Sequence, residues 1–238
     1  MQNVPFPDRV AAGRALAREL EHFQGPDTIV LGVPRGGVVV AAEVARALGS
    51  PLDVIVARKL GLPGQPECAI GAVAGDAPPQ LDEEGLRLLG IPPEYVEAET
   101  ERQRVELRRR EALYRGDTPP LPVAGKTVLV VDDGLATGFT VAAALHALRA
   151  AGVARLIAAA PVAAPHAVRF LSRLADEVIA VTVPLTFSAV GHWYVNFDAT
   201  SDAEVIETLR RMKEDLPVRS REAGFDAGTH KVRHYQDT

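Results

Sequence analysis

KTVLVVDDGLATGFT, residues 126–140, joins an apolar run to two adjacent acids and then to a loop of small residues. The apolar run predicts a buried strand over 126–133, and the residues after the loop predict a helix over 140–152. Ligands of open α/β sheets bind outside the carboxyl ends of the strands. We therefore expect Asp132 and Asp133 to lie at a binding site.

Strands and helices alternate on both sides of this stretch. Short apolar runs rich in β-branched residues are typical of buried strands, and apolar residues at helical spacing separate them. The predicted strands cover residues 28–33, 51–57, 126–133, 154–163 and 176–184, and the predicted helices cover residues 9–22, 38–49, 140–152, 165–175 and 201–216. The pattern predicts an α/β fold, doubly wound, with a mostly parallel central sheet of about five strands.

Residues 77–122 differ in composition from the rest of the chain. PEYVEAETERQRVELRRREALYRG (93–116) is dense in both charge signs and in helix formers, which favours a long solvated helix. This segment interrupts the sheet, so we interpret it as a helical insertion. The last predicted helix has Ser201 as its N-cap and Glu204 at the capping-box position. The polar residues 217–238 predict a mobile C-terminal tail.

Composition limits the classes of protein that need consideration. The 238 residues carry a net charge of −5, so no global basic surface favours nucleic acid, and no nucleic-acid partner is expected. The single cysteine, Cys68, excludes an internal disulfide and is expected to be a small buried residue. No signal-type apolar core opens the sequence and no stretch approaches a membrane span. We expect a soluble cytoplasmic protein without a membrane partner.

The loop after Asp132 and Asp133 has the chemistry of a phosphate cradle. Residues 136–140 lead into a helix N-terminus, whose backbone N–H groups and dipole favour a dianion. A sugar phosphate fits both parts, with hydroxyls on the carboxylates and the phosphate on the loop. Two nucleotide motifs fail: AGKT (124–127) lacks the first glycine of a P-loop and precedes its strand, and PRGG (34–37) lacks the three-glycine dinucleotide spacing.

Two further basic segments follow predicted strands. In PRGG (34–37), Gly36 and Gly37 allow the backbone to approach a ligand, and Arg35 offers a fork for phosphate oxygens. An ordinary glycine turn is the alternative. Arg58 and Lys59 follow the second predicted strand, where two cations suit a pyrophosphate leaving group. A solvated surface pair is the alternative there.

VLVVDDGLATGFT resembles the phosphoribosyl-pyrophosphate binding motif of type I phosphoribosyltransferases: four apolar residues, two acids and a small-residue loop that ends in threonine. Gly134 departs from it, because an aliphatic residue or serine is usual there. The likeness extends through PRGG and the VGHWY segment and covers roughly residues 9–210. It is to an uncharacterised bacterial branch of phosphoribosyltransferase-like proteins. The resemblance implies a phosphoribosyltransferase domain over 1–216, with a small hood at 185–198 that the N-terminal segment could join.

The resemblance also implies roles for individual residues. Asp132 and Asp133 would receive the ribose hydroxyls directly or through Mg²⁺-bound water, and with Arg58 and Lys59 they form the predicted catalytic set. The loop after the first strand would bind pyrophosphate, with a cis peptide between Pro34 and Arg35. Phe187, just before Val190-Gly191, would stack on the base, although the acidic residue expected after that pair is not in register. The full predicted substrate-binding set is Pro34, Arg35, Gly36, Gly37, Asp132, Asp133, Gly134, Leu135, Ala136, Thr137, Gly138, Phe139, Thr140 and Phe187.

The function implied by the resemblance is a Mg²⁺-dependent phosphoribosyltransferase. Its donor would be phosphoribosyl pyrophosphate and its acceptor a nitrogenous base, with a purine-like base weakly favoured. One alternative is a regulator that binds phosphoribosyl pyrophosphate or a nucleotide without catalysis. Another is a hydrolase or phosphorylase of a phosphorylated sugar. The 93–116 segment is a candidate lid or lid support, a solvated helix or a dimer-forming helix, and a homodimer is a candidate assembly.

Overall fold

The structure is a computed structural model that describes residues 5–75 and 77–215, so the predicted tail at 217–238 lies outside the described residues. A five-stranded parallel sheet forms its centre, in the order β2–β1–β6–β7–β8. This confirms the predicted doubly wound α/β fold. The strands are β1 (Thr28–Gly32), β2 (Leu52–Val54), β6 (Thr127–Val131), β7 (Arg155–Val162) and β8 (Glu177–Thr182).

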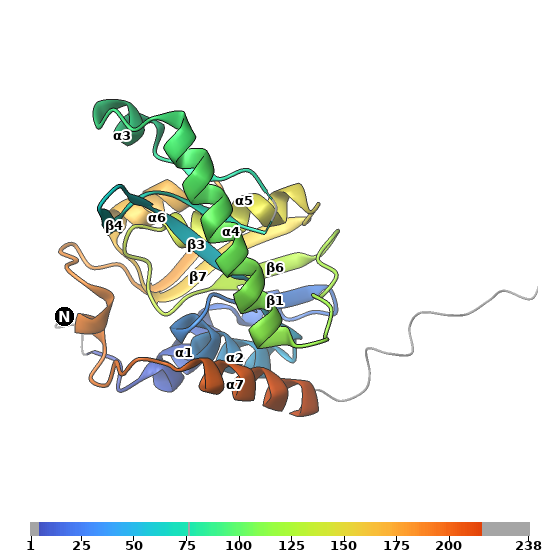
Figure 1. Ribbon diagram of the computed structural model, residues 1–238. Coiled ribbons are helices and arrows are strands. Elements are labelled where there is room, and N and C mark those ends of the chain that lie inside the picture. Colours follow the sequence, from blue (N-terminus) through green and yellow to red (C-terminus); the bar gives the residue numbers. More distant parts are fainter. Residues whose placement is uncertain (1–4, 76, 216–238) are drawn as a thin grey trace, which may run out of the picture.

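Helices cover both faces of this sheet (Figure 1). One face carries α1 (Arg9–Glu19), α2 (Gly36–Leu48) and α7 (Asp202–Asp215), and the other carries α5 (Phe139–Ala150) and α6 (Pro165–Leu171). Alternate residues of β6 point to opposite sides: Leu129 and Val131 pack toward the first face, whereas Val128 and Val130 pack toward the second. Burial on both faces explains why this strand is a continuous apolar run in the sequence.

The order of the strands determines where a ligand can bind. From β1 the chain crosses to β2 on one side, and it later returns to β6 on the other side of β1. The sheet therefore reverses its direction of growth between β1 and β6, which is the point where open α/β sheets bind ligands. The loops after these two strands, 33–35 and 132–138, lie next to each other at the carboxyl edge.

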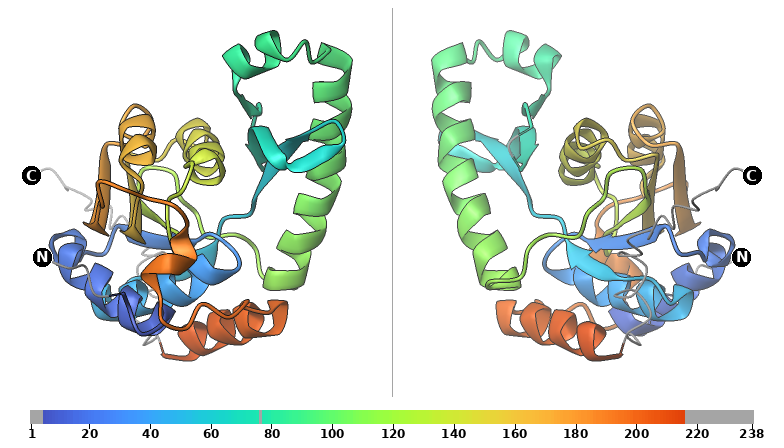
Figure 2. Two further views of the ribbon diagram at one scale, coloured as in Figure 1. Left: turned by 90° about the vertical axis from the view of Figure 1, so that its left-hand side faces the viewer. Right: turned by 90° about the vertical axis from the view of Figure 1, so that its right-hand side faces the viewer.

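A separate lobe, residues 57–115, projects from the central sheet (Figure 2). It contains an antiparallel sheet in the order β3–β4–β5 and two helices. Its elements are β3 (Ala57–Leu62), β4 (Gln65–Ala74), β5 (Gln80–Leu81), α3 (Glu83–Leu88) and α4 (Pro93–Arg115). The predicted long helix is confirmed, but the departure from the central sheet starts at Ala57, well before the predicted insertion at 77–122.

Helix α4 is only partly solvated. Its charged residues form one side, while Val96, Leu107 and Tyr114 are buried against the lobe or the main body. The prediction of a solvated helix therefore describes one face of α4 but misses the other. No helix in the described ranges, 5–75 and 77–215, is long and apolar enough to cross a membrane.

The 185–198 segment, the predicted hood, packs with the described N-terminal residues. It contains the 3₁₀ helix η2 (Val190–Trp193), and a second 3₁₀ helix, η1 (Glu21–Phe23), follows α1. Phe6 N–H donates to the Trp193 carbonyl at 2.8 Å, and Val195 N–H donates to the Phe6 carbonyl at 2.8 Å. These bonds form an isolated parallel bridge between Phe6 and Tyr194.

Candidate functional site

Asp132 and Asp133 lie immediately after β6, at the carboxyl edge of the sheet. The Asp133 N–H donates to Asp132 Oδ1 at 2.8 Å, and Arg9 Nε donates to Asp133 Oδ2 at 2.8 Å. Within the described part of the chain, the other oxygen of each carboxylate accepts no hydrogen bond. The pair therefore offers one oxygen from each residue to a ligand.

Burial and mutual repulsion disfavour two charges in this place. Burial raises the pKa of Asp132 well above its usual value, and the neighbouring Asp133 charge raises it further. Burial also raises the pKa of Asp133, although its bond from Arg9 opposes this shift. A ligand cation or a set of hydroxyl donors would favour the ionised forms and so offset both shifts.

The PRGG loop approaches the acid pair closely. A Cβ added at Gly37 would lie 2.8 Å from the Asp132 Cα, and one added at Gly36 would overlap the Asp133 carboxylate. Real Cβ atoms do not make such contacts, so glycine is needed at both positions. The peptide between Pro34 and Arg35 is cis, as the resemblance implied.

The loop after the acid pair forms a small cavity of about 120 Å³ at the start of α5. Gly138 has φ 83°, a left-handed conformation, and is the N-cap of this helix. The first amides of a helix have no intrahelical partner, so those after Gly138 face the cavity side of the helix start, and Phe139 N–H makes only a long bond of 3.5 Å to Thr137 Oγ1. Leu135 differs, because it is buried and its N–H donates to the Val162 carbonyl at 2.9 Å. Its amide holds the loop in place and is not available to a phosphate.

A second cavity of about 350 Å³ unites the predicted elements of the site. The PRGG loop, both acids and Thr140 line it together with Arg9 and residues from the segment 197–200. Its described lining residues are Arg9, Val33, Pro34, Arg35, Gly36, Asp132, Asp133, Thr140, Phe197, Ala199 and Thr200. The tertiary structure thus brings residues 34–36 together with Asp132, Asp133 and Thr140 around one cavity.

Arg58 and Lys59 lie in the lobe. The second strand of the central sheet ends at Val54, and both residues belong to β3, which begins at Ala57. Arg58 Nε donates to Gln103 Oε1 of α4 at 3.0 Å, and burial lowers the pKa of Arg58. The strand predicted over 51–57 therefore ends earlier, and the two cations follow β2 as residues of the next strand; their role toward pyrophosphate stays a prediction.

Two other predicted residues have distinct surroundings. Phe187 is half-buried among the aromatic residues of the hood and lines neither of the two cavities. Cys68 is exposed on β4, so the expectation that it is buried is wrong.

Sequence reasoning missed Arg9 and Phe197, and it considered Tyr194 only as a residue that could stack on the base. Besides its bond to Asp133, Arg9 donates through Nη1 to the Asp198 carbonyl at 2.7 Å, and its guanidinium lies 4.0 Å from the centre of the Phe197 ring. The Tyr194 hydroxyl donates to the Asp133 carbonyl at 2.5 Å. No local pattern signals these contacts, since Arg9 and Asp133 are 124 residues apart.

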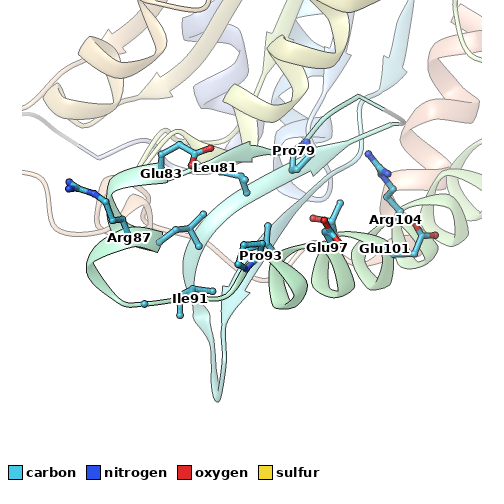
Figure 3. A pocket seen from close by; sticks show the side chains of 13 residues that line it. Pro79, Leu81, Glu83, Arg87, Ile91, Pro93, Glu97, Glu101 and Arg104 are labelled. Atoms are coloured by element: carbon cyan, nitrogen blue, oxygen red, sulfur yellow. The ribbon is translucent and has the colours of Figure 1, made fainter.

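A larger cavity of about 640 Å³ lies in the lobe, between β5, α3 and α4. Figure 3 shows Leu81, Ile91 and Pro93 among its lining side chains, together with charged residues such as Glu97. None of the predicted site residues lines it. Within residues 5–75 and 77–215, no group of three or more histidine, cysteine or acidic side chains could hold a metal ion by itself.

Comparisons with known proteins identify the family of the chain. The family model described as a phosphoribosyl transferase domain matches residues 8–194. Two Mycobacterium tuberculosis proteins, from strains CDC 1551 and H37Rv and each named "Putative phosphoribosyl transferase", are 42% identical over 211 residues. These residues are 89% of this chain but 48% of each relative, so the chain spans about half the length of the curated relatives it matches.

One solved structure resembles the chain over nearly its whole described length. The crystal structure of TT1426 from Thermus thermophilus superposes with a TM-score of 0.76 at 44% sequence identity. The match covers 88% of this chain and 99% of TT1426. The fold, the acid pair with its loop and the family match lead to one conclusion. The chain belongs to the phosphoribosyl transferase domain family.

Proposed function

We propose that this protein is a Mg²⁺-dependent phosphoribosyltransferase that takes phosphoribosyl pyrophosphate as donor and a nitrogenous base as acceptor. The observation that carries the proposal is the single cavity shared by the acid pair, the PRGG loop and the start of α5. Phosphoribosyl pyrophosphate has one chemical group for each of these parts: a ribose for the acid pair, a pyrophosphate for the PRGG loop and a 5′-phosphate for the start of α5.

The proposed roles follow from the groups that each part offers. The free carboxylate oxygens of Asp132 and Asp133 accept hydrogen bonds from the ribose hydroxyls. The amides and hydroxyls of 136–140 bind the 5′-phosphate at the helix N-terminus. The loop at 34–37 binds pyrophosphate, and the close packing of Gly36 and Gly37 against the acids keeps it near the ribose.

The donor set at the acid pair fits Mg²⁺. This ion keeps several waters and is usually bound by one or two carboxylates plus substrate phosphates, so it needs no cage of protein ligands. Asp132 and Asp133 supply two half-buried carboxylates, and their raised pKa values show that this place disfavours uncompensated negative charge. When bound, Mg²⁺ would supply positive charge for the pyrophosphate oxygens.

The reaction exchanges one bond at the anomeric carbon for another. The bond to the pyrophosphate oxygen breaks, the electron pair leaves with pyrophosphate, and a nitrogen of the base forms the new bond and then loses its proton. The protein contributes position and exclusion of water, and no protein nucleophile is required. A purine-like acceptor stacked near Phe187 is the weakly favoured case.

A base panel tests the proposal against its two alternatives. Pyrophosphate release is measured with phosphoribosyl pyrophosphate, Mg²⁺ and purine, pyrimidine or simple amine acceptors. Release that requires one class of acceptor supports the transferase. Tight donor binding with no release under any condition would favour the regulator, and release without an acceptor would favour a hydrolase.

Changing Asp132 or Asp133 to asparagine should weaken binding of phosphoribosyl pyrophosphate. Each change removes a charged acceptor, so we expect a loss of about ten-fold or more in calorimetry with Mg²⁺ present. Asp27→Asn is the matched control, because Asp27 pairs with Lys126 on an exposed surface at the opposite end of the sheet. Unchanged affinity in both site variants contradicts the site assignment.

A further inference from the structure

Arg9 connects three parts of the protein that are far apart in sequence. It is the first residue of α1, it contacts Asp133 after β6, and it contacts Phe197 and Asp198 at the end of the hood. Its side chain is only 12% exposed and lines the cavity of the proposed donor site. A side chain in this position can affect the donor site without belonging to the family's binding motif.

The contacts of Arg9 use the shape of a guanidinium. Nε donates to the Asp133 carboxylate, Nη1 donates to the Asp198 carbonyl, and the planar group lies over the Phe197 ring. A planar fork makes these contacts together, whereas a lysine ammonium is a point charge without an equivalent plane. The orientation of Arg9 is therefore set from two sides before any ligand binds.

Arg9 in turn restricts Asp133. Its bond engages Oδ2, and the Tyr194 hydroxyl engages the Asp133 backbone carbonyl. A Cβ added at Gly36 would lie 2.5 Å from Arg9 Nε, so the PRGG loop packs directly against this pair. With Oδ2 occupied, Oδ1 is the oxygen that remains for a ligand.

We propose that Arg9 is a positioning residue of the donor site, which holds the Asp133 carboxylate so that one oxygen is presented to the ribose of phosphoribosyl pyrophosphate. This inference rests on the proposed function. In this proposal Arg9 does not contact the reacting atoms. Arg9 affects donor binding only by orienting Asp133.

A double-mutant cycle tests this path. Donor affinity is measured by calorimetry, with phosphoribosyl pyrophosphate and Mg²⁺, for the wild type, Arg9→Met, Asp133→Asn and the double variant. Because Arg9 and Asp133 are neighbours in one hydrogen-bond network, we expect Arg9→Met to weaken donor affinity about ten-fold. If Arg9 acts through Asp133, the double variant should bind the donor no more than about two-fold more weakly than Asp133→Asn. The reason is that Asp133→Asn has already removed the carboxylate that Arg9 positions.

Two further variants separate positioning from general stability. Arg14→Met is the matched control, since Arg14 lies on the same helix and pairs with Glu43 while 70% of its side chain is exposed. It should bind the donor as the wild type does. Arg9→Lys should bind with intermediate affinity, and it replaces Arg9→Met in the cycle if the methionine variant fails to fold.

The outcomes distinguish this inference from the function on which it rests. Additive losses in the double variant, or unchanged affinity in Arg9→Met while Asp133→Asn is weakened, would overturn the role of Arg9 alone. Unchanged affinity in Asp133→Asn would overturn the role of Arg9, and unchanged affinity in both Asp132→Asn and Asp133→Asn would overturn the donor site as well.

Discussion

Gly134 is the one position in the acid-pair motif that departs from the pattern of type I phosphoribosyltransferases. A Cβ at this position would overlap the side chain of Val190, at the start of η2. The structure thus gives a physical reason for the departure: the hood packs against the loop at this residue. Glycine is required by a contact that the local sequence does not reveal.

Changing Gly134 to alanine should therefore destabilise the protein. Overpacking of a filled site costs about 1–3 kcal/mol in the free energy of unfolding, which urea denaturation measures. Gly25→Ala is the control, because a Cβ at Gly25 has open space around it. Adding Val190→Ala should recover part of the loss, and a double variant as unstable as the sum of its parts would contradict this explanation.

At the same scale, the sequence predicted the acid pair, the PRGG loop and the small-residue loop correctly as neighbours. Each follows a strand that the apolar pattern identifies, and parallel strands end at one edge. Arg9, Tyr194 and Phe197 could not be predicted in the same way. They reach the site from α1 and the hood, and no periodicity relates those segments to β6.

At the scale of elements, the N-terminus of α7 has the capping box that its sequence predicted. Glu204 N–H donates to Ser201 Oγ at 3.2 Å, and Ser201 N–H donates to Glu204 Oε2 at 2.7 Å. The bond from the Ser201 N–H lowers the pKa of the Glu204 carboxyl. The ionised form of Glu204 is therefore favoured in the folded protein.

This shift predicts a pH dependence of stability. Because the folded pKa lies below the unfolded one, the contribution of Glu204 is present above the unfolded value of about 4.5 and is lost as the pH falls through the folded pKa. We expect Glu204→Gln to lower Tm at pH 7 and the difference from the wild type to shrink in more acidic buffer. Glu19→Gln, at an exposed position of α1, provides the baseline in thermal unfolding. A difference that stays constant with pH would contradict this role of the carboxylate.

The elements that the sequence missed include β3 and β4. Residues 51–57 are apolar except for Asp53, but the parallel strand ends at Val54 and an antiparallel strand begins at Ala57. Periodicity reports which residues are buried, and it does not report which sheet buries them. For this reason the sequence did not show that Arg58 and Lys59 belong to a strand of the lobe.

At the scale of the whole molecule, a buried ion pair connects the lobe to the central sheet. Arg115, the last residue of α4, donates through Nε to Asp53 of β2 at 3.0 Å and through Nη2 to the Val54 carbonyl at 2.6 Å. Asp53 also accepts the Leu121 N–H, at 3.2 Å. Nearby, the Tyr114 hydroxyl donates to Asp202 of α7 at 2.6 Å, and burial with this bond raises the pKa of Tyr114 to about 12.

Arg115→Met should destabilise the protein strongly. It leaves Asp53 buried without its counter-charge, which costs about 3–5 kcal/mol in the free energy of unfolding. Arg108→Met is the matched control on α4, because Arg108 makes an exposed pair with Glu101 and its loss should cost less than about 1 kcal/mol in urea denaturation. Equal effects of the two changes would exclude Asp53–Arg115 as the connection that holds the lobe.

The sequence by itself determined the parallel sheet, the acid pair at its edge and the loop that follows, because burial on both faces produces apolar runs and ligand loops follow them. Only the tertiary structure decided that Arg9 hydrogen-bonds Asp133, that a side chain at position 134 would overlap Val190, and that residues 57–115 form a lobe. These features depend on contacts between segments far apart along the chain. A local pattern of residues does not contain the free energy of such contacts, so it cannot predict them.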